Sequence, residues 1–485
     1  MNRPPLNLSA LAPRLVAATR DIASLVREAG GRALMVGGAV RDLIVGGIEV
    51  KDVDIEVFGV EPDALQRLLA PKYPFDACGV SFGVLKVKGY DIDVALPRRE
   101  SKLGEGHRAF AIASDPTLSV FDASTRRDFT VNAIYCDPLT GEVEDPHGGL
   151  ADLENRILRH VSPKFREDPL RVLRGMQFVA RFDLTPAPET IEICRTIGIE
   201  GLASERLFEE WAKLLTKGVA IGKGLEFLKA TGWLRYFPEL AALVGCEQDP
   251  AWHPEGDVWE HTKLCLDAFA RRRTGDRDED LVVGLAVLCH DLGKPATTKY
   301  DATTGHIRSI GHDEAGLEPT LSFLRRITNE ERLLKEVPPL VTSHMQPFAL
   351  WKSKAGDVAI RRLSLKVMRI DRLIRVARAD DEGRLPDRVP SSTGGADLEW
   401  LAAAAERLRI AAEAPKPILM GRHLIELGYK PSMQFGPWLE AVFEAQLDGA
   451  FANLDGAIAY FKTNVHTQFK SRHVICPLCQ IDVIR

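Results

Sequence analysis

The stretch that decides the fold of the first part of the chain is ValGlyGlyAlaValArgAsp, residues 36–42, with LysAspValAspIle following at residues 51–55. The apolar residues 33–36 lead into the glycine pair and predict a strand, and the second part begins an alternating strand. Because alternate residues of a strand point to the same side, Asp52 and Asp54 are expected together on one side of a sheet. The sequence therefore predicts a sheet that carries two neighbouring carboxylates.

The rest of the first 150 residues predicts a small domain of strands with flanking helices, of α/β or α+β type. The predicted elements are a helix over 14–30 that ends at a glycine pair, strands over 33–36, 53–60, 84–87 and 90–95, and a short edge strand over 142–145. A turn at Gly89 would join the strands 84–87 and 90–95 as a hairpin.

After residue 150 the periodicity is almost entirely helical, to about residue 465. The fold class expected for the whole chain is α+β, with a small mixed β-sheet followed by all-α domains. Residues 384–397 are polar and rich in proline and glycine, and they form the best candidate linker.

Composition limits the classes of protein that the chain can belong to. It has 485 residues, which suggests about three domains, and 63 Lys plus Arg against 68 Asp plus Glu give a net charge of −5. A generally polybasic protein is excluded, so any nucleic-acid contact must use a local patch. No run approaches the roughly 20 apolar residues of a membrane helix, and no signal peptide is recognisable. The eight cysteines are mostly isolated, as in reduced proteins of the cytoplasm, where we expect the protein to be found.

The paired carboxylates predict a site for a hard divalent cation. Asp52 and Asp54 would repel each other without positive charge between them, and Mg²⁺ prefers oxygen ligands. A third carboxylate on a neighbouring strand would complete the site; Asp91 and Asp93 are available, and Asp93 is preferred. Two metal ions in such a site can activate a hydroxyl group and stabilise a leaving pyrophosphate.

The glycine pair predicts a place for the phosphates. Gly37 and Gly38 have no Cβ to block an approaching oxygen, and Arg41 could bind the same phosphates through two nitrogens. Taken alone, a glycine pair is usually an ordinary turn and two alternate aspartates are usually a solvated strand end. Their order, a short loop apart, favours the functional interpretation.

With these motifs in place, the chain resembles the class II tRNA nucleotidyltransferases (CCA-adding enzymes) and the bacterial poly(A) polymerases. Further stretches carry the resemblance, which covers about residues 33–215: ArgArgAspPheThrValAsnAla (126–133), AspProHisGlyGlyLeuAlaAspLeu (145–153), GluAspProLeuArgValLeuArg (167–174) and SerGluArg (204–206). The resemblance implies that Arg127 and Asp128 bind the ribose and triphosphate. It also implies that an RNA 3′-hydroxyl attacks the α-phosphate of CTP or ATP and releases pyrophosphate.

The stretch 167–174 resembles the helix that selects the nucleobase in this family. Asp168 and Arg171 are three residues apart and are expected on one helix face, where acceptor and donor groups together can imitate a partner base. Arg174, one turn further, could support the base or the phosphates. The alternative is an ordinary surface pair worth a few tenths of a kcal/mol. Many relatives carry an arginine where this chain has Gln177, so a phosphate or base contact is missing here.

Two other regions bear on substrate. Residues 98–110 form a polar loop that, in the family, takes part in the switch from C to A addition. Local positive charge predicts a surface for the tRNA acceptor stem and 3′ end, recognised largely by shape. The basic residues are Arg156, Arg159, His160, Lys164, Arg166, Arg171 and Arg174.

A second cluster begins with His261 in residues 252–261 and continues with LeuCysHisAspLeuGlyLys, residues 288–294. Together with a later aspartate it resembles the HD phosphohydrolase pattern, His…His-Asp…Asp. The four expected metal ligands are His261, His290, Asp291 and Asp380. Mixed nitrogen and oxygen donors suit Mg²⁺, Mn²⁺ or Ni²⁺ without choosing sharply among them.

Three more residues accompany this pattern. His312 and His344 could hold a second metal or the substrate phosphate, and Lys294 could balance phosphate charge. Related multifunctional CCA proteins imply phosphatase, 2′-nucleotidase and 2′,3′-cyclic phosphodiesterase activity. The alternative is that the histidines are ordinary core residues.

The resemblance implies five segments: a nucleotidyltransferase head (1–150), a helical neck that selects the nucleobase and binds RNA (151–245), an HD domain (246–390), a helical tail (391–465) and a flexible extension (466–485). Cys476 and Cys479 in that extension form only half of a zinc site.

Two alternative functions stay open. One is a poly(A) polymerase or an enzyme that adds only A, because the same head serves all of these. The other is an HD phosphohydrolase whose head is a degenerate RNA-binding module.

Overall fold

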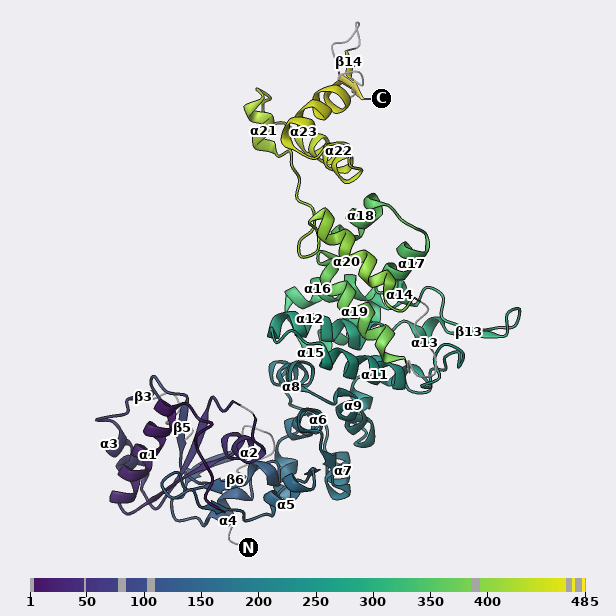
Figure 1. Ribbon diagram of the computed structural model, residues 1–485. Helices are drawn as coiled ribbons and strands as arrows, with labels where there is room; N and C mark the ends of the chain where they lie inside the picture. The colour runs from purple at the N-terminus through teal and green to yellow at the C-terminus, as the bar shows by residue number, and fades with distance from the viewer. Residues whose placement is uncertain are drawn as a thin grey trace. The chain divides into compact units, whose positions relative to one another are not determined.

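A computed structural model describes residues 4–47, 49–76, 84–102, 110–384, 393–467, 473–475 and 482–484 (Figure 1). The chain divides into two compact units, Met1–Ala241 and Ala242–Arg485. A small mixed sheet lies in the first unit and helices make up most of the rest, which confirms the predicted α+β class. The finer division into five segments stays a prediction. Among the described residues, no helix is both long and apolar enough to cross a membrane.

The first unit carries the main sheet. Its strands are β1 (Arg32–Val36), β2 (Val53–Phe58), β3 (Phe75–Asp76), β4 (Val84–Val87), β5 (Ile92–Ala95), β6 (Arg98–Lys102), β7 (Phe110–Ser114), β8 (Tyr135–Cys136), β9 (Val143–Glu144), β10 (Ile157–Leu158) and β11 (Thr185–Pro186). Its helices are α1 (Pro13–Glu28), α2 (Gly38–Val45), α3 (Pro62–Leu69), α4 (Val120–Ser124), α5 (Gly149–Glu154), α6 (Leu170–Phe182), α7 (Pro188–Arg195), α8 (Ser204–Lys217), α9 (Ile221–Ala230) and α10 (Pro238–Ala241), with 3₁₀ turns at Thr130–Asn132, Pro163–Glu167 and Trp233–Tyr236.

Seven strands form the sheet in the order β3-β4-β5-β2-β1-β8-β9. Only β2 and β5 run parallel within it; the other neighbouring strands are antiparallel. The hairpin of β4 and β5 turns at Gly89 and β9 forms an edge, as predicted. The short β8 beside β1 carries no sequence signal long enough to predict it.

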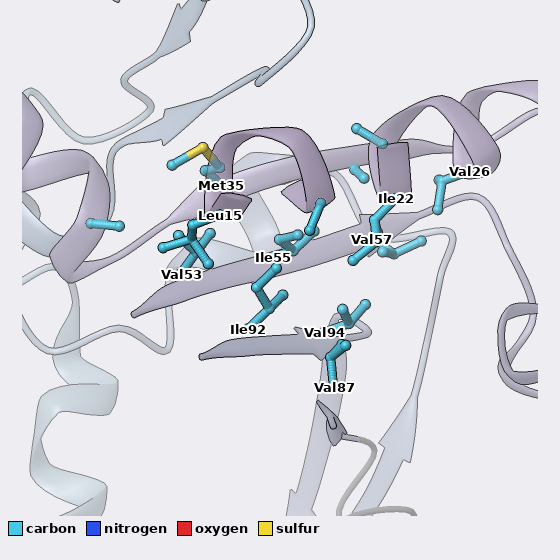
Figure 2. Close-up of a cluster of buried hydrophobic side chains, with 14 of the residues drawn as sticks. Leu15, Ile22, Val26, Met35, Val53, Ile55, Val57, Val87, Ile92 and Val94 are labelled. Atoms are coloured by element: carbon cyan, nitrogen blue, oxygen red, sulfur yellow. The ribbon is translucent and has the colours of Figure 1, made fainter. Parts of the chain in front are cut away.

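Helix α1 covers an apolar face of the sheet (Figure 2). Side chains of β2 at Val53, Ile55 and Val57 are buried there against Ile22 and Val26 of α1. Strand alternation therefore turns the residues between them, Asp54 and Glu56, to the opposite face. The core under α1 thus decides which face of the sheet can hold a site.

Helix α6 organises the second half of this unit by packing against α8 and α9. Small residues let the helices approach closely: a Cβ on Gly175 of α6 would lie 2.8 Å from the Phe227 ring of α9. This packing fixes the start of α6, where the expected base-selecting residues lie.

The second unit is helical apart from short hairpins. Its elements are α11 (Val258–Arg271), α12 (Arg277–Cys289), α13 (Lys294–Thr297), β12 (Lys299–Asp301), β13 (His306–Arg308), α14 (His312–Ala315), α15 (Leu317–Ile327), α16 (Glu331–Val341), α17 (Gln346–Lys352), α18 (Asp357–Val367), α19 (Ile370–Gly383), α20 (Ala396–Leu408), α21 (Gly421–Glu426), α22 (Phe435–Leu447), α23 (Leu454–Tyr460), a π-helical turn (Phe461–His466), β14 (His473–Ile475) and β15 (Asp482–Ile484).

Helix α12 is the centre of this unit, since all of its residues from Asp280 to Cys289 are buried. It packs against α11, α16 and α19. Helix α20 packs against α17, α18 and α19. A separate apolar core forms between Leu419 and Val465 in the tail. Most of the predicted linker, residues 385–392, lies outside the described part of the chain.

Candidate active sites

The first candidate site is the acidic end of β2 and β5. In their parallel register Asp54 lies directly beside Asp93, so the expected third carboxylate is on the neighbouring strand, as predicted. Asp52 comes one residue before β2 begins. Burial raises the pKa of Asp54, and the nearby Asp52 and Asp93 carboxylates raise it further against the opposing effect of Arg127. Concentrated negative charge of this kind, made only of oxygen donors, fits a hard cation such as Mg²⁺.

Arg127 brings positive charge to the same place. One guanidinium nitrogen lies 3.5 Å from Glu56 Oε2, and the Tyr135 hydroxyl donates to that oxygen at 2.7 Å. Nearby carboxylates and Tyr135 raise the pKa of Arg127 although burial opposes its charge. Glu56 and Tyr135 were not predicted from the sequence, although the strand alternation that pairs Asp52 with Asp54 also puts Glu56 on their side of the sheet.

Gly37, in the predicted phosphate turn, lies next to the carboxylate of Asp54. Its φ is +81°, and a Cβ placed on it would lie 3.2 Å from Asp54 Oδ2 and 3.4 Å from Arg127 Nη1. The glycine therefore leaves open the space between a carboxylate and a guanidinium. Asp54, Asp93 and Arg127 also line one cavity of about 270 Å³, together with Arg126.

Arg41 is buried instead of reaching into that cavity. It donates to Asp42 Oδ1 at 2.8 Å and to Asn132 Oδ1 at 2.6 Å, and its guanidinium lies 4.4 Å from the centre of the Phe182 ring. It thus joins α2 to α6 and to the 126–133 stretch. The direct phosphate contact expected of Arg41 stays a prediction.

Buried Asp128 and half-buried Arg174 form a pair beside this network. Arg174 donates to Asp128 Oδ2 at 2.7 Å, and Asn132 donates to Asp128 Oδ1 at 2.9 Å. Burial opposes ionisation of Asp128, but Arg174 and the hydrogen bonds hold its pKa below the ordinary value. Gln177, one turn beyond Arg174, is buried and its Oε1 makes no hydrogen bond with the described residues.

The expectation that Asp168 and Arg171 share a helix face is wrong. Helix α6 begins at Leu170, and Asp168 is extended (φ −130°, ψ 107°) because the residue before a proline avoids helical dihedrals. Asp168 Oδ1 accepts from the Leu170 N–H at 3.0 Å, and Oδ2 accepts from Arg206 at 2.7 Å. Arg206 belongs to the SerGluArg stretch that begins α8.

Arg171 nevertheless lies close to the acidic site. It donates to the Arg126 carbonyl at 2.6 Å and to the Lys164 carbonyl at 2.7 Å. Arg126 and Arg127 line the cavity that holds Asp54. The start of α6 and the acidic strands therefore meet across residues 126–127.

Several residues of the predicted RNA surface are engaged with protein groups. Arg156 pairs with Asp183 at 2.9 Å, and Arg159 lies 3.2 Å from Asp152. Lys164 and Arg166 are exposed and donate to threonine hydroxyls. The role of this surface in RNA binding stays a prediction, and Arg156, Lys164 and Arg166 are its exposed members.

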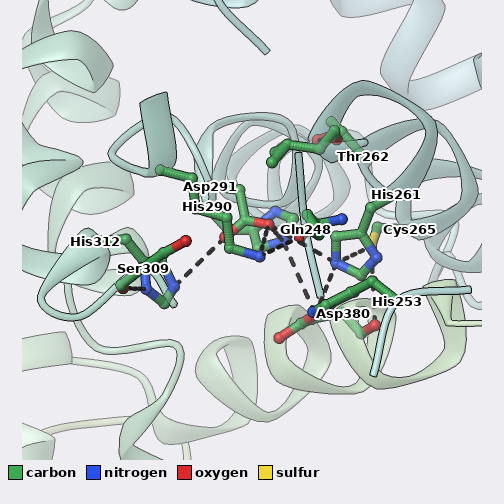
Figure 3. A network of polar contacts seen from close by, with 12 residues as sticks. Gln248, His253, His261, Thr262, Cys265, His290, Asp291, Ser309, His312 and Asp380 are labelled. Atoms are coloured by element: carbon green, nitrogen blue, oxygen red, sulfur yellow. Dashed lines mark hydrogen bonds and ion pairs between the residues drawn. The ribbon is translucent and has the colours of Figure 1, made fainter. Parts of the chain in front are cut away.

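The second candidate site brings together all four predicted ligands of the HD pattern (Figure 3). His261 comes from α11, His290 and Asp291 follow α12, and Asp380 lies on α19. His261 Nε2 lies 3.0 Å from Asp380 Oδ1, and His290 Nε2 lies 3.2 Å from Asp291 Oδ2. The two histidines and Asp291 are almost completely buried, and Asp380 is 9% exposed.

The donors fit a metal ion. In the described structure no hydrogen bond satisfies His290 Nε2 or either oxygen of Asp291, although Lys294 forms an ion pair with Asp291 Oδ2 at 2.7 Å. Buried polar atoms are rarely left without partners. Burial opposes a charge on His290, but Asp291 beside it raises the pKa of His290 to about 10. The cluster therefore attracts positive charge.

His312 and His344 lie on the other side of Asp291, where Figure 3 shows His312. His312 Nε2 is 3.4 Å from Asp291 Oδ1 and 3.2 Å from His344 Nε2. Asp291 thus presents one oxygen to His290 and the other to His312. The structure brings these residues together as predicted, and their role as a second metal site or phosphate site stays a prediction.

Three residues around this centre were missed by the sequence analysis. Glu255 Oε1 lies 2.9 Å from His261 Nδ1 and 2.8 Å from His253 Nδ1, which orients the His261 ring. Cys265, one turn beyond His261, places its sulfur 3.3 Å from His261 Nε2. The spacing of four residues on one helix was the available signal for Cys265.

The second centre opens into a cavity of about 250 Å³. Positive side chains at Lys294, Arg308 and Arg384 and the indole of Trp252 line it. Such a lining suits an anionic substrate with an aromatic group. Cys476 and Cys479 lie outside the described residues, as do 103–109 of the loop expected between the third carboxylate and Arg126. The cysteines in the described part form no disulfide.

Residues 33–159 match the family described as poly A polymerase head domain. The multifunctional CCA protein of Stenotrophomonas maltophilia (strain R551-3) is 36% identical over 368 residues, which cover 72% of this chain and 86% of the relative. That of Xylella fastidiosa (strain M23) is 35% identical over 388 residues, 77% of this chain and 89% of the relative.

Solved structures show the same fold. The Bacillus stearothermophilus CCA-adding enzyme in complex with CTP aligns with a TM-score of 0.63 and 22% identity, over 95% of this chain and 100% of that chain. The Thermotoga maritima CCA-adding enzyme complexed with tRNA aligns with a TM-score of 0.56 and 20% identity, over 93% of this chain and 97% of that chain.

Proposed function

Because the chain belongs to the class II CCA-adding enzyme family, with multifunctional CCA proteins as relatives, we propose that it adds C and A from CTP and ATP to the 3′ end of tRNA. The observation that carries the proposal is the parallel register that sets Asp54 beside Asp93. Asp52 comes two residues before Asp54, and the Gly37 turn lies next to the Asp54 carboxylate. When bound there, Mg²⁺ supplies the charge that favours a nucleophilic 3′-hydroxyl and a leaving pyrophosphate.

The protein groups then have distinct roles. Asp52, Asp54 and Asp93 hold the cation, and the open backbone at Gly37 receives phosphate oxygens. Arg127, already held in place by Glu56, neutralises charge on the triphosphate. These charges are fixed in place before the reaction, so they can stabilise the charge that develops on the phosphates without the reorganisation that water would need.

Asp168 and Arg171 are proposed to select the base without a nucleic-acid template. The carboxylate accepts hydrogen bonds and the guanidinium donates them, and both are held by the protein: Asp168 by Arg206, and Arg171 by backbone carbonyls. Selection then comes from hydrogen-bonding groups of fixed position. Arg171→Ala is expected to change the ratio of C to A incorporation more than the total rate.

The head proposal is tested by Asp54→Asn, which keeps the shape of the side chain and removes its charge. Incorporation of labelled CMP and AMP into tRNA lacking its 3′ nucleotides should fall by roughly 10²–10³-fold. Asp76→Asn is a matched control, because Asp76 lies on the edge strand β3 and pairs with Lys88 at 2.8 Å. Unchanged incorporation by Asp54→Asn would favour the alternative in which the head is a degenerate RNA-binding module.

We also propose that the second centre is a metal-dependent phosphohydrolase acting on 2′-phosphates or 2′,3′-cyclic phosphates of RNA ends. The unsatisfied atoms of His290 and Asp291 favour a bound metal, and Lys294, Arg308 and Arg384 in the cavity lining favour a phosphate. His312 and His344 would hold a second metal with Asp291, and Lys294 would balance phosphate charge. Hydrolysis of 2′,3′-cyclic AMP, before and after chelation and metal addition, tests this activity.

A further inference from the structure

A thiol lies inside the second centre. Cys265 and His261 are four residues apart on α11, so their side chains lie on one face of the helix. The sulfur is completely buried, 3.3 Å from His261 Nε2 (Figure 3). The donor atoms of His261, Cys265, His290 and Asp380 all lie within 4.8 Å of one another.

The neighbouring helix keeps the sulfur in this position. A Cβ on Gly383 of α19 would lie 2.3 Å from the Cys265 sulfur, so α19 can approach the thiol only because residue 383 is glycine. The sulfur also lies 3.8 Å from the Asp380 carbonyl oxygen. Its surroundings are therefore the polar groups of the centre, whereas the core cysteine Cys194 belongs to no such donor cluster among the residues that the structure describes.

The spacing of the donors fits one ion. With metal–sulfur and metal–nitrogen bonds of about 2.3 and 2.1 Å, two ligands of one ion stand about 3.1–3.6 Å apart. The separation of Cys265 Sγ and His261 Nε2 is 3.3 Å. An independent observation points to the same ligand: the buried His290 Nε2 lacks a hydrogen-bond partner among the described residues.

We propose that Cys265 is a thiolate ligand of the second centre, which therefore takes a thiophilic divalent metal such as Zn²⁺ or Fe²⁺ in preference to Mg²⁺. The inference rests on the proposed metal centre and names the chemistry of its metal. Thiolate and imidazole donors favour such ions, whereas Mg²⁺ favours oxygen donors. As the metal–sulfur bond forms, the thiol proton passes to solvent.

Cobalt(II) is the probe that tests the inference in the full-length protein. Sulfur bound to Co²⁺ gives a near-ultraviolet charge-transfer absorption, which nitrogen and oxygen ligands do not give. The head cannot contribute it, because its candidate ligands are the carboxylates of Asp52, Asp54 and Asp93. The metal-free protein is titrated with Co²⁺, and absorption and bound cobalt are measured together.

The wild-type protein should show the sulfur band, and Cys265→Ser and Cys265→Ala should lose it. Cys246→Ser is the control that keeps the band, since Cys246 lies in the same unit with its sulfur 3.7 Å from the Thr298 hydroxyl. The Zn²⁺ affinity of Cys265→Ser should fall by more than roughly 10–100-fold, which is the usual cost of losing a residue that only hydrogen-bonds to a metal ligand.

The outcomes separate the inference from the function on which it rests. Wild-type protein that binds cobalt in a His290-dependent manner without the sulfur band overturns the role of Cys265 and leaves the metal centre standing. Equal bound cobalt in wild type and His290→Ala, with no sulfur band, overturns the second centre itself and the inference with it. Both readouts come from wild type and His290→Ala, so they stand even if a Cys265 variant does not fold.

Discussion

Replacing Gly37 with alanine tests the phosphate-binding turn separately from the carboxylates around it. Gly37 has φ +81° and ψ −138°, in a region that residues with a side chain rarely occupy. Residues held in such a region cost about 1–3 kcal/mol each. A domain of ordinary stability, about 5–15 kcal/mol, would stay mostly folded after this loss.

Activity should fall much further than stability. The new methyl group would lie 3.2 Å from Asp54 Oδ2 and 3.4 Å from Arg127 Nη1, where a phosphate oxygen is expected. Misplacement of a reacting group by about 1 Å can cost 10²-fold, so we expect a loss of about 100-fold in nucleotide incorporation. Urea unfolding measures the stability, and release of pyrophosphate with shortened tRNA measures the reaction.

Gly89→Ala is the matched control. Gly89 has nearly the same φ, +79°, in the hairpin turn of β4 and β5. Apart from the adjacent residues, the nearest atom to a Cβ placed on it would be Arg14 Nη2, at 3.9 Å. It should lose similar stability and keep its activity per folded molecule. If Gly37→Ala retained activity within about twofold of Gly89→Ala, the proposed role of the turn would be refuted.

Three further perturbations address other parts of the molecule. Asp128→Asn should leave Arg174 with a neutral partner, cost about 1–3 kcal/mol and raise KM for the nucleotide; unfolding and steady-state kinetics would show this, and an unchanged KM would contradict it. His290→Ala should abolish metal-dependent phosphohydrolysis while nucleotide incorporation continues; retained hydrolysis would mean that another site performs it. Arg372 lowers the pKa of Glu279 to about 2, so Glu279 contributes stability above its ordinary 4.5 and loses it as the pH falls towards 2. Wild type but not Glu279→Gln should therefore lose this increment between about pH 4.5 and 2 in acid-unfolding curves; parallel curves would contradict the assignment.

The sheet and its acidic edge were predictable because their signals are local. Strand alternation placed Asp54 opposite the core, and a second alternating strand supplied Asp93. The parallel pairing of β2 with β5, which sets these two side by side, is not local, and the sequence predicted only that Asp93 lies on a neighbouring strand. The Gly89 turn was likewise readable from one glycine between two apolar runs.

The side-chain partners were less predictable. Asp168 lies outside the helix because Pro169 follows it and a residue before proline avoids helical dihedrals. The three-residue spacing from Asp168 to Arg171 takes no account of that effect. Arg41 turned into a buried network because Asn132 and Phe182 come from distant parts of the chain. Cys265 carried a signal, four residues beyond His261, yet a cysteine on an apolar helix is usually core.

The most direct test of the central claim is the sequence of the 3′ ends made from tRNA transcripts that lack one, two or three terminal nucleotides. We predict that CTP alone adds up to two C residues, that ATP alone extends only ends already carrying both, and that the two together restore CCA and stop. Runs of A made from ATP alone on every transcript would contradict the account and identify a poly(A)-type enzyme instead.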